Sequence, residues 1–334
     1  MKNNMPAVSI IIPIYNSSQF IIKTLISLEA QSYNNYEIIL INDGSTDGSL
    51  NILMDYKKNK NNIILHSQKN SGVSVARNKG IELANGDFIA FLDSDDTYSP
   101  TFLEKMLAKQ KENDANIVYC GFNRIDISGK LSPIYNSFME GNILNPYLQR
   151  NGYFHFSGML IRKKILTDNL IYFELGCNIS EDLLFTVKLL SNFDCYCVKE
   201  YLFNYVQRTG SVMSSLWYED KWLADIQGRQ KILLYLLNNY DKDDKQEIIK
   251  LASAFIFQRE ISYLIDCIKK MNYKKIKYYL KQTDFLDKEI LFNEHKLNNK
   301  DKNKFKVIQK NNRVIWFFYT LYYRFFRLNV KFFK

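Results

Sequence analysis

The sequence predicts an α/β fold, with a mostly parallel sheet and flanking helices, followed by a helical C-terminal region. In the first 120 residues, short apolar runs rich in β-branched residues alternate with longer stretches of helical periodicity. The short runs are apolar on both faces, as a parallel sheet covered by helices requires. After Ser215 the pattern is helical, with few glycines or prolines. We therefore expect an α/β domain at residues 1–215, a helical region at 216–300 and a tail at 301–334.

The individual elements follow from the same patterns. Helical spacing of Phe20, Leu25 and Leu28 predicts a helix over 18–31, and a proline near its start favours another over 100–113. The predicted strands are Val8 to Tyr15, Tyr36 to Asp43, Asn62 to Gln68, Asp87 to Asp93, Ala115 to Phe122, Phe154 to Ile161 and Cys195 to Val206. The remaining predicted helices are Glu181 to Asn192, Trp217 to Asn239 and Gln246 to Met271.

Length and composition are those of a globular protein with one or two domains. The chain has 334 residues, of which 46% are hydrophobic and 24% charged, and this balance excludes a disordered or collagen-like chain. The formal net charge of +10 is concentrated at the end, because from Asp301 onward nine Lys or Arg residues face one acidic residue. A basic partner-binding surface is therefore expected in the tail and not over the whole domain.

Cysteine usage and hydropathy indicate the cellular setting. The five cysteines lack the paired spacing of a zinc or redox site, so we expect reduced thiols in a cytosolic protein. Cys195 and Cys197 alternate onto one face of a predicted strand, where core packing is favoured over metal binding. The run Val8 to Tyr15 is short for a signal-peptide core, and no stretch of about 20 uncharged apolar residues predicts a spanning helix.

Polar side chains close three of the predicted strands. The first strand ends in Tyr15-Asn16, the second in the run 42–47, and the fourth in the run 93–96. In open α/β sheets, ligands bind outside the carboxyl ends of the strands. The three runs can therefore converge on one crevice.

The acidic run at 93–96 suggests a divalent cation. Alternation along the strand points Asp93 and Asp95 the same way, where their charges repel and Mg²⁺ or Mn²⁺ would relieve the repulsion. Mg²⁺ commonly takes one or two protein carboxylates together with phosphate oxygens, which suits a diphosphate. The alternative is that Asp96 or Ser99 caps the next helix and the other acids are solvated.

Glycine-rich phosphate loops are absent. Neither GxGxxG after the first strand nor GxxxxGK[ST] occurs, so a metal or basic side chains must neutralise any bound phosphate. This absence disfavours a nicotinamide-dependent oxidoreductase and a kinase-like site.

Five short motifs follow one another along the chain: VSIIIPIYN at 8–16, NDGSTD at 42–47, NSGVSVARN at 70–78, DSDD at 93–96 and the pair Glu181-Asp182. In order and spacing they resemble the motifs of the family 2 inverting glycosyltransferases of the GT-A fold. Each motif alone is weak, but five in register over about residues 6 to 210 are specific. The resemblance implies a bacterial-type, metal-dependent enzyme that moves one sugar from a nucleotide diphosphate donor, such as a UDP-sugar, to a hydroxyl group.

The resemblance also implies a role for each matching residue at the donor site. Asp43 would accept a hydrogen bond from the donor base, and uracil's imide N–H suits that acceptor. Asn42 departs from the family's two acidic residues at this point, although Asp43 keeps the second. Asp93 would contact the ribose and, with Asp95, would bind Mn²⁺ or Mg²⁺ on the diphosphate. The full expected donor set is Pro13, Tyr15, Asp43, Arg77, Asp93, Ser94, Asp95 and Arg208.

Two arginines of this set have alternatives. Arg77, in the Ala-Arg-Asn element, would contact base or phosphate; otherwise it is a surface arginine paired with an acid. Arg208 precedes Thr209-Gly210-Ser211, and by resemblance it stabilises the leaving diphosphate, a role that matters most in the transition state. Otherwise it is an exposed arginine on a turn.

Asp182 is the expected catalytic residue. By resemblance it is the general base, because inversion needs a carboxylate that takes the acceptor hydroxyl proton. The alternative is that Glu181 and Asp182 only stabilise the start of a helix. The QxxRW element of processive polymerases is absent, which favours one sugar per encounter. The isolated His155 is expected to pack or lie at the surface, with lining of the acceptor site as the alternative.

The tail, RVIWFFYTLYYRFFRLNVKFFK from Arg313, combines basic and aromatic residues. This composition is typical of a helix lying on an anionic membrane, with a core-packed terminal helix as the alternative. Nucleic acid is disfavoured, since no recognition fold accompanies the tail. At helical spacing one face comprises Thr320, Arg324, Arg327, Lys331 and Lys334, and another comprises Trp316, Tyr319, Tyr323, Phe326 and Val330.

A membrane-bound tail fits an enzyme on the inner face of the cell membrane. Relatives that build capsule, exopolysaccharide or lipopolysaccharide commonly use a glycan acceptor on a lipid carrier, so we expect such an acceptor here. A second hypothesis is a catalytically inactive scaffold of a polysaccharide assembly complex, which the intact acidic residues disfavour.

Overall fold

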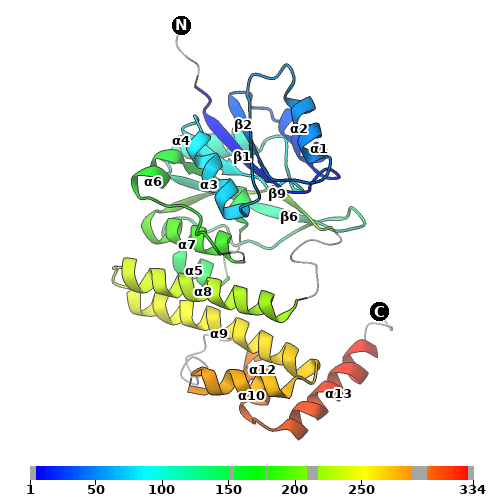
Figure 1. The fold of residues 1–334 in the computed structure, drawn as a ribbon. Coiled ribbons are helices and arrows are strands. Elements are labelled where there is room, and N and C mark those ends of the chain that lie inside the picture. The colour runs from blue at the N-terminus through cyan, green and yellow to red at the C-terminus, as the bar shows by residue number, and fades with distance from the viewer. Residues whose placement is uncertain (1–4, 151–153, 178, 209–216, 288–298, 330–334) are drawn as a thin grey trace. The chain divides into compact units, whose positions relative to one another are not determined.

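The computed structural model describes residues 5–150, 154–177, 179–208, 217–287 and 299–329. The chain divides into two compact units, Met1–Leu216 and Trp217–Lys334 (Figure 1). Each unit has its own hydrophobic core. The predicted α/β fold followed by helices is confirmed.

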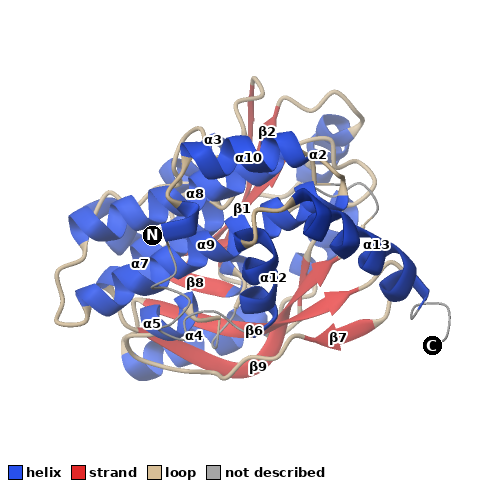
Figure 2. Ribbon diagram, turned by 90° about the horizontal axis from the view of Figure 1, so that it is seen from below, coloured by secondary structure: helices blue, strands red, loops and turns tan. Residues whose placement is uncertain are grey.

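Nine strands of the described residues form one mixed sheet in the first unit. Its order is β3-β2-β1-β4-β8-β6-β9-β5, with β7 paired to β6. The first four strands of this order are parallel, whereas β8 is antiparallel to both β4 and β6. Figure 2 shows β6 between β8 and β9, with β7 beside it. The strands are β1 (Val8–Ile14), β2 (Tyr36–Asp43), β3 (Ile63–Gln68), β4 (Phe88–Phe91), β5 (Thr97–Tyr98), β6 (Ile117–Ile125), β7 (Leu131–Pro133), β8 (Met159–Arg162) and β9 (Cys195–Val206).

Helices cover both faces of the parallel part of the sheet. On one face, Ile10 and Ile12 of β1 pack in a cluster with residues of α1, α2 and α4. On the other face, α3 crosses β1 so closely that a Cβ at Gly80 would lie 2.2 Å from Ile11 Cγ2. The helices of this unit are α1 (Ile21–Glu29), α2 (Ser49–Lys57), α3 (Val73–Leu83), α4 (Phe102–Asn113), α5 (Leu144–Leu148), α6 (Lys163–Asp168) and α7 (Glu181–Asn192).

Most predicted elements of the first unit lie where the sequence placed them. The exception is the strand predicted from Phe154 to Ile161. The structure has a 3-10 turn at Phe156–Gly158, and β8 begins only at Met159. The local cause is His155, whose ring accepts a hydrogen bond from the Ser157 N–H and so ends the extended backbone before the turn. The short strands β5 and β7 were not predicted.

The second unit is helical, as predicted, with α8 (Glu219–Asn239), α9 (Lys245–Lys269), α10 (Tyr273–Gln282), α12 (Asn299–Gln309) and α13 (Arg313–Asn329). Phe257 of α9, Phe305 of α12 and Trp316 of α13 are fully buried in one cluster. Within the described residues, no helix combines the length and the apolarity that a membrane crossing demands.

The tail helix packs differently from the prediction at one residue. Thr320 was placed with the basic face, but it is fully buried on the same side as Trp316. Its hydroxyl donates to the Ile268 carbonyl of α9, which satisfies the polar group and lets it face the core. The predicted positions Val330, Lys331 and Lys334 lie outside the described residues.

Candidate active site

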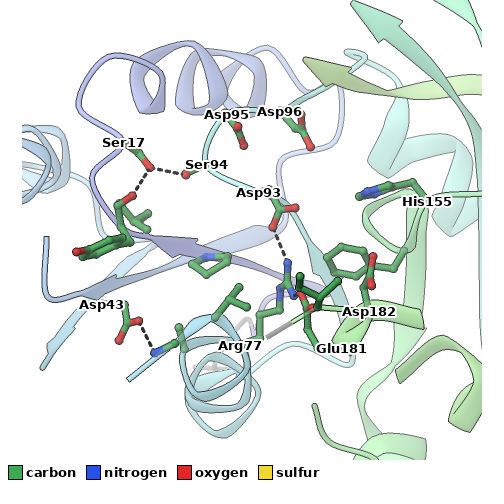
Figure 3. A pocket seen from close by; sticks show the side chains of 18 of the residues that line it. Ser17, Asp43, Arg77, Asp93, Ser94, Asp95, Asp96, His155, Glu181 and Asp182 are labelled. Carbon is green, nitrogen blue, oxygen red and sulfur yellow. Dashed lines mark hydrogen bonds and ion pairs between the residues drawn. The ribbon is translucent and has the colours of Figure 1, made fainter. Parts of the chain in front are cut away.

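A pocket of about 570 Å³ opens in the first unit at the carboxyl ends of β1, β2 and β4 (Figure 3). The first turns of α3 and α7 and the segment after β9 complete its wall. The structure places every residue assigned from the sequence in this one pocket. These residues are Pro13, Tyr15, Asp43, Arg77, Asp93, Ser94, Asp95, Asp182 and Arg208.

Asp43, at the end of β2, fixes the loop that leads into α3. Its carboxylate accepts hydrogen bonds from Gln68 Nε2 at 2.8 Å and from the backbone N–H groups of Ser71 and Gly72, both at 2.9 Å. The side chain is almost fully buried, so these three donors keep its orientation constant. A carboxylate has about four lone-pair sites, and one therefore remains for a ligand in the pocket.

The acidic run after β4 is held by partners from distant segments. Asp93 pairs with Arg77, with 2.9 Å between Oδ1 and the guanidinium, and Asp95 pairs with Arg208. Asp96 accepts from the Val206 N–H at 2.8 Å. Helix α4 begins after Thr101 with no side-chain cap, so neither Asp96 nor Ser99 caps it. The capping alternative is therefore wrong.

Burial and mutual repulsion affect the protonation of these acids. Burial raises the pKa of Asp95, the nearby charge of Asp93 adds to this rise, and Arg208 opposes it. Burial also raises the pKa of Asp96 well above its ordinary value, with Asp93 and Asp95 contributing. A cation arriving next to Asp95 would lower the energy of its charged form.

Ser94 braces the acidic run against α1. Its hydroxyl lies 2.7 Å from the Ser17 hydroxyl, and its carbonyl accepts from Thr24 Oγ1 at 3.0 Å. Both serines line the pocket. These contacts fix the position of the backbone segment that carries Asp93 and Asp95.

Arg77 is a buried cation that joins two acidic segments. Its guanidinium lies 2.9 Å from Asp93 and 2.9 Å from Glu181, and the side chain is 4% exposed. Its charged end also lies over the rings of Phe156 and Phe173, at 4.4 and 5.1 Å. Burial lowers the pKa of Arg77, but the two carboxylates outweigh burial and leave that pKa raised. The alternative interpretation was a surface arginine paired with an acid. Arg77 does pair with acids, but it is buried and does not lie at the surface.

Asp182 lies in the first turn of α7, directly after Glu181. Its Oδ1 accepts from the Leu183 N–H at 2.8 Å, and it forms no ion pair with any described residue. Burial raises the pKa of Asp182 despite the opposing charge of Arg77. A carboxylate with a raised pKa is a stronger proton acceptor than a solvated one.

Arg208 follows β9 and contacts the acidic run through Asp95. Besides pairing with Asp95, its guanidinium lies 4.6 Å from the ring of Phe20. The side chain is 30% exposed, so it remains accessible from the pocket. Thr209, Gly210 and Ser211, which complete the predicted element, lie outside the described residues.

Several pocket residues had not been assigned from the sequence. Ser17, Phe156 and Tyr205 belong to none of the five motifs, Asp96 ends the motif at 93–96 without an assigned binding role, and His155 had been considered only as an alternative. Position along a strand could have identified Tyr205, because β9 runs parallel to β6 and ends at the same edge. The others depend on packing between distant segments.

The carboxylates fit a metal only together with a ligand. Among the described residues, no group of three or more His, Cys, Asp or Glu side chains is arranged as a metal site. Asp93 and Asp95 provide two carboxylates in one pocket, and both are neutralised by arginines here. Because Mg²⁺ usually completes its coordination with phosphate oxygens and water, two such residues are sufficient for a metal bound with a diphosphate.

Comparisons with known proteins identify glycosyltransferases as similar to this chain. Residues 9–170 match the family model described as Glycosyl transferase family 2. The putative glycosyltransferase EpsH of Bacillus subtilis (strain 168) is 43% identical over 117 residues, which is 35% of this chain and 34% of EpsH. The putative teichuronic acid biosynthesis glycosyltransferase TuaG of the same strain is 40% identical over 124 residues, 37% of this chain and 49% of TuaG. The match thus spans only a third to a half of these relatives.

Solved structures share the fold. Residues 1–349 of S. aureus TarS in complex with UDP-GlcNAc superpose with a TM-score of 0.65 at 21% identity, covering 91% of this chain and 90% of that one. The complex of the same TarS fragment with UDP gives a TM-score of 0.63 at 20% identity, with the same coverage. At this identity the likeness concerns the fold alone.

Proposed function

Since residues 9–170 identify this chain as a family 2 glycosyltransferase, we propose that it transfers one sugar, with inversion, from a UDP-sugar to a hydroxyl group of a glycan acceptor. The observation that carries the proposal is the gathering of Asp43, Asp95, Arg208 and Asp182 around one pocket. Asp43 supplies a hydrogen-bond acceptor for the nucleobase of the donor. Asp95 and Arg208 supply charges for binding a diphosphate, and Asp182 supplies a proton acceptor.

The nucleoside is proposed to bind beside Pro13, Tyr15 and Asp43. Tyr15 is about half exposed and offers an aromatic ring, whereas the remaining lone pair of Asp43 can accept the imide N–H of uracil. That TarS was crystallised with UDP and with UDP-GlcNAc supports a uridine nucleotide on this fold.

Asp182 is proposed as the general base. In the inverting reaction the acceptor hydroxyl loses its proton to the Asp182 carboxylate while its oxygen forms the bond to the anomeric carbon. The bond from that carbon to the diphosphate breaks on the opposite face, and the electron pair leaves with the phosphate oxygen. Glu181 is less suited to this role, because its Oε1 already pairs with Arg77.

Arg208 and a divalent cation are proposed to stabilise the leaving diphosphate. Arg208 can exchange its Asp95 partner for phosphate oxygens, and this exchange frees Asp95. Asp95, with Asp93, would then hold Mn²⁺ or Mg²⁺, which supplies positive charge to the diphosphate. The raised pKa of Asp95 is consistent with a site that becomes favourable only when positive charge is added.

Besides the donor and the acceptor, the proposed partner is an anionic membrane surface. Binding to it would place the enzyme on the inner face of the cell membrane. There it would lie next to a lipid-linked acceptor of capsule, exopolysaccharide or lipopolysaccharide synthesis. Trp316 anchors α13 to α9. The other side of α13 exposes apolar residues within a strongly basic segment. Phe317→Ser/Phe318→Ser should weaken sedimentation with phosphatidylglycerol vesicles and leave UDP binding unchanged. The exposed apolar residues are Val314, Ile315, Phe317, Phe318 and Tyr322.

Two measurements test the enzymatic proposal. Calorimetric titration of UDP should show binding that Mn²⁺ strengthens and that Asp95→Ala loses. Asp182→Asn should keep UDP binding and lose transfer by ~10²-fold or more, as expected of a general base. Asp194→Asn is the matched control, because Asp194 is exposed beyond the far end of α7. Normal turnover of Asp182→Asn would refute the assignment of the base, and a UDP-binding chain without any transfer would favour the scaffold.

A further inference from the structure

His155 is an aromatic residue with a polar edge on the pocket wall. Its ring stacks on Phe203, with 4.9 Å between centroids and 23° between planes, and lies 5.1 Å from Phe156 and 5.9 Å from Tyr205. Phe122 packs at 6.0 Å. Four aromatic rings from β6, β9 and the turn before β8 therefore fix the plane of the imidazole.

The hydrogen bond to His155 fixes its tautomer. The Ser157 N–H donates to Nδ1 at 3.2 Å, so Nδ1 carries no proton and the neutral ring carries its proton on Nε2. Burial lowers the pKa of His155 to about 4, even though Asp93 and Glu181 oppose this shift. At neutral pH the residue is thus an uncharged donor, and it cannot accept a proton at Nε2.

The Nε2–H has no hydrogen-bond acceptor among the described residues. Figure 3 shows His155 reaching into the pocket between the acidic run at Asp93–Asp96 and the base Asp182. Because His155 is only partly buried and lines the pocket, its Nε2–H remains available to donate a hydrogen bond to a bound ligand.

We propose that His155 determines donor specificity by donating a hydrogen bond from Nε2 to an oxygen atom on the sugar that is transferred. The proposal rests on the proposed function, which places the diphosphate at Asp95 and Arg208 and the anomeric carbon in front of Asp182. The sugar ring must then lie between these groups, in the region that His155 borders. A fixed neutral donor suits a hydroxyl or acetamido carbonyl oxygen, and the cationic Arg208 serves the charged phosphates.

The test compares two substitutions at the same position. His155→Phe keeps an aromatic ring for the stack on Phe203 and removes the donor. His155→Gln places an amide N–H at about the reach of Nε2. His66→Phe is the matched control, because His66 lies on β3 and does not line the pocket. Each variant is titrated calorimetrically with UDP and with UDP-glucose, UDP-galactose, UDP-GlcNAc and UDP-GalNAc.

The expected result separates the sugar from the nucleotide. His155→Phe should bind UDP within about twofold of the wild type and bind the preferred UDP-sugar about 2- to 15-fold more weakly, as the loss of one neutral hydrogen bond predicts. His155→Gln should recover most of that affinity. An equal loss for UDP and UDP-sugar would overturn the inference, as would an unchanged UDP-sugar affinity combined with a raised KM for the acceptor.

A second measurement does not depend on a variant's folding. In a ¹⁵N-edited histidine spectrum of the full chain, His155 should be neutral at pH 5.5, with the proton on Nε2. A charged ring or the opposite tautomer at that pH would refute the proposal for His155 alone. If the wild-type chain binds none of the five nucleotides, the proposed donor site is wrong and the inference falls with it.

Discussion

Replacing Arg77 with methionine removes the cation that Asp93 and Glu181 share. Methionine keeps an unbranched apolar chain next to Phe156 and Phe173, so the change is mainly one of charge. The two carboxylates would then remain close to each other in a poorly solvated site, without the guanidinium that lies 2.9 Å from each of them.

The expected loss of stability is about 3–5 kcal/mol, the usual cost of removing one partner from a buried ion pair. The loss should depend on pH. Burial already raises the pKa of Glu181, and losing Arg77 raises it further. A carboxyl whose pKa is higher in the folded state keeps its stability contribution below its unfolded pKa and loses it as pH rises through the folded pKa. The variant should therefore be more destabilised at pH 7.5 than at pH 5.5.

The assay must report on the first unit. All three tryptophans, Trp217, Trp222 and Trp316, belong to the second unit, so indole fluorescence follows the wrong part of the chain. Native-state hydrogen exchange of amides in β1 and β2 is suitable, and a loss of 3 kcal/mol corresponds to exchange on the order of 100-fold faster. Arg124→Met is the matched control, because Arg124 is exposed on β6 and its replacement should change stability by less than about 0.5 kcal/mol.

Arg77→Lys should fall between the wild type and Arg77→Met, since an ammonium cannot span both carboxylates as the guanidinium does. The double variant Arg77→Met/Glu181→Gln should recover part of the loss, because only one unpaired acid remains. Exchange rates in Arg77→Met equal to those of the wild type at both pH values would refute the reasoning. They would show that the two carboxylates do not need this cation.

Three further outcomes are expected. Gly80→Ala should lower the midpoint of thermal unfolding of the first unit, because the new Cβ would lie 2.2 Å from Ile11 Cγ2, and overpacking of this kind costs about 1–3 kcal/mol; an unchanged midpoint would show that α3 can shift away from β1. Trp316→Ala should cost about 3–5 kcal/mol and speed hydrogen exchange in α9, α12 and α13, with exchange in the first unit unaffected. Because the pKa of His155 is about 4 when folded and about 6.5 in an unfolded chain, its protonation should destabilise the wild type as pH falls from 6.5 to 4 by up to about 3 kcal/mol. His155→Phe should lack this loss, and parallel urea-unfolding curves for both chains over that range would contradict it.

Local patterns in the sequence were sufficient where a residue's role depends on its own strand or helix. The ends of β1, β2 and β4 were visible as polar residues after apolar runs, and parallel strands bring such ends to one edge of the sheet. The first turn of α7, which carries Asp182, was visible from the acidic pair before an amphipathic run. Their positions follow from chain direction and periodicity, whereas their roles at the donor site and in catalysis were assigned from the resemblance of the motifs.

The same patterns failed where a side chain is satisfied by a distant partner. Thr320 was assigned to the basic face of its helix, but the carbonyl of Ile268 accepts its hydroxyl proton and makes burial favourable. Asp96 was considered as a helix cap, but its partner is the Val206 N–H, 110 residues away. Helical and strand periodicity contains no information about such partners.

Short-range spacing and chain direction were enough to predict the α/β class, the parallel strands β1, β2 and β4 and the acidic edge of the sheet. Tertiary structure decided the antiparallel insertion of β8 between β4 and β6, and with it the approach of His155 to the pocket. It also decided that Arg77 lies between Asp93 and Glu181, which are 16 and 104 residues away in the chain. The physical reason is that a buried charge or donor is positioned by whichever partners packing brings to it.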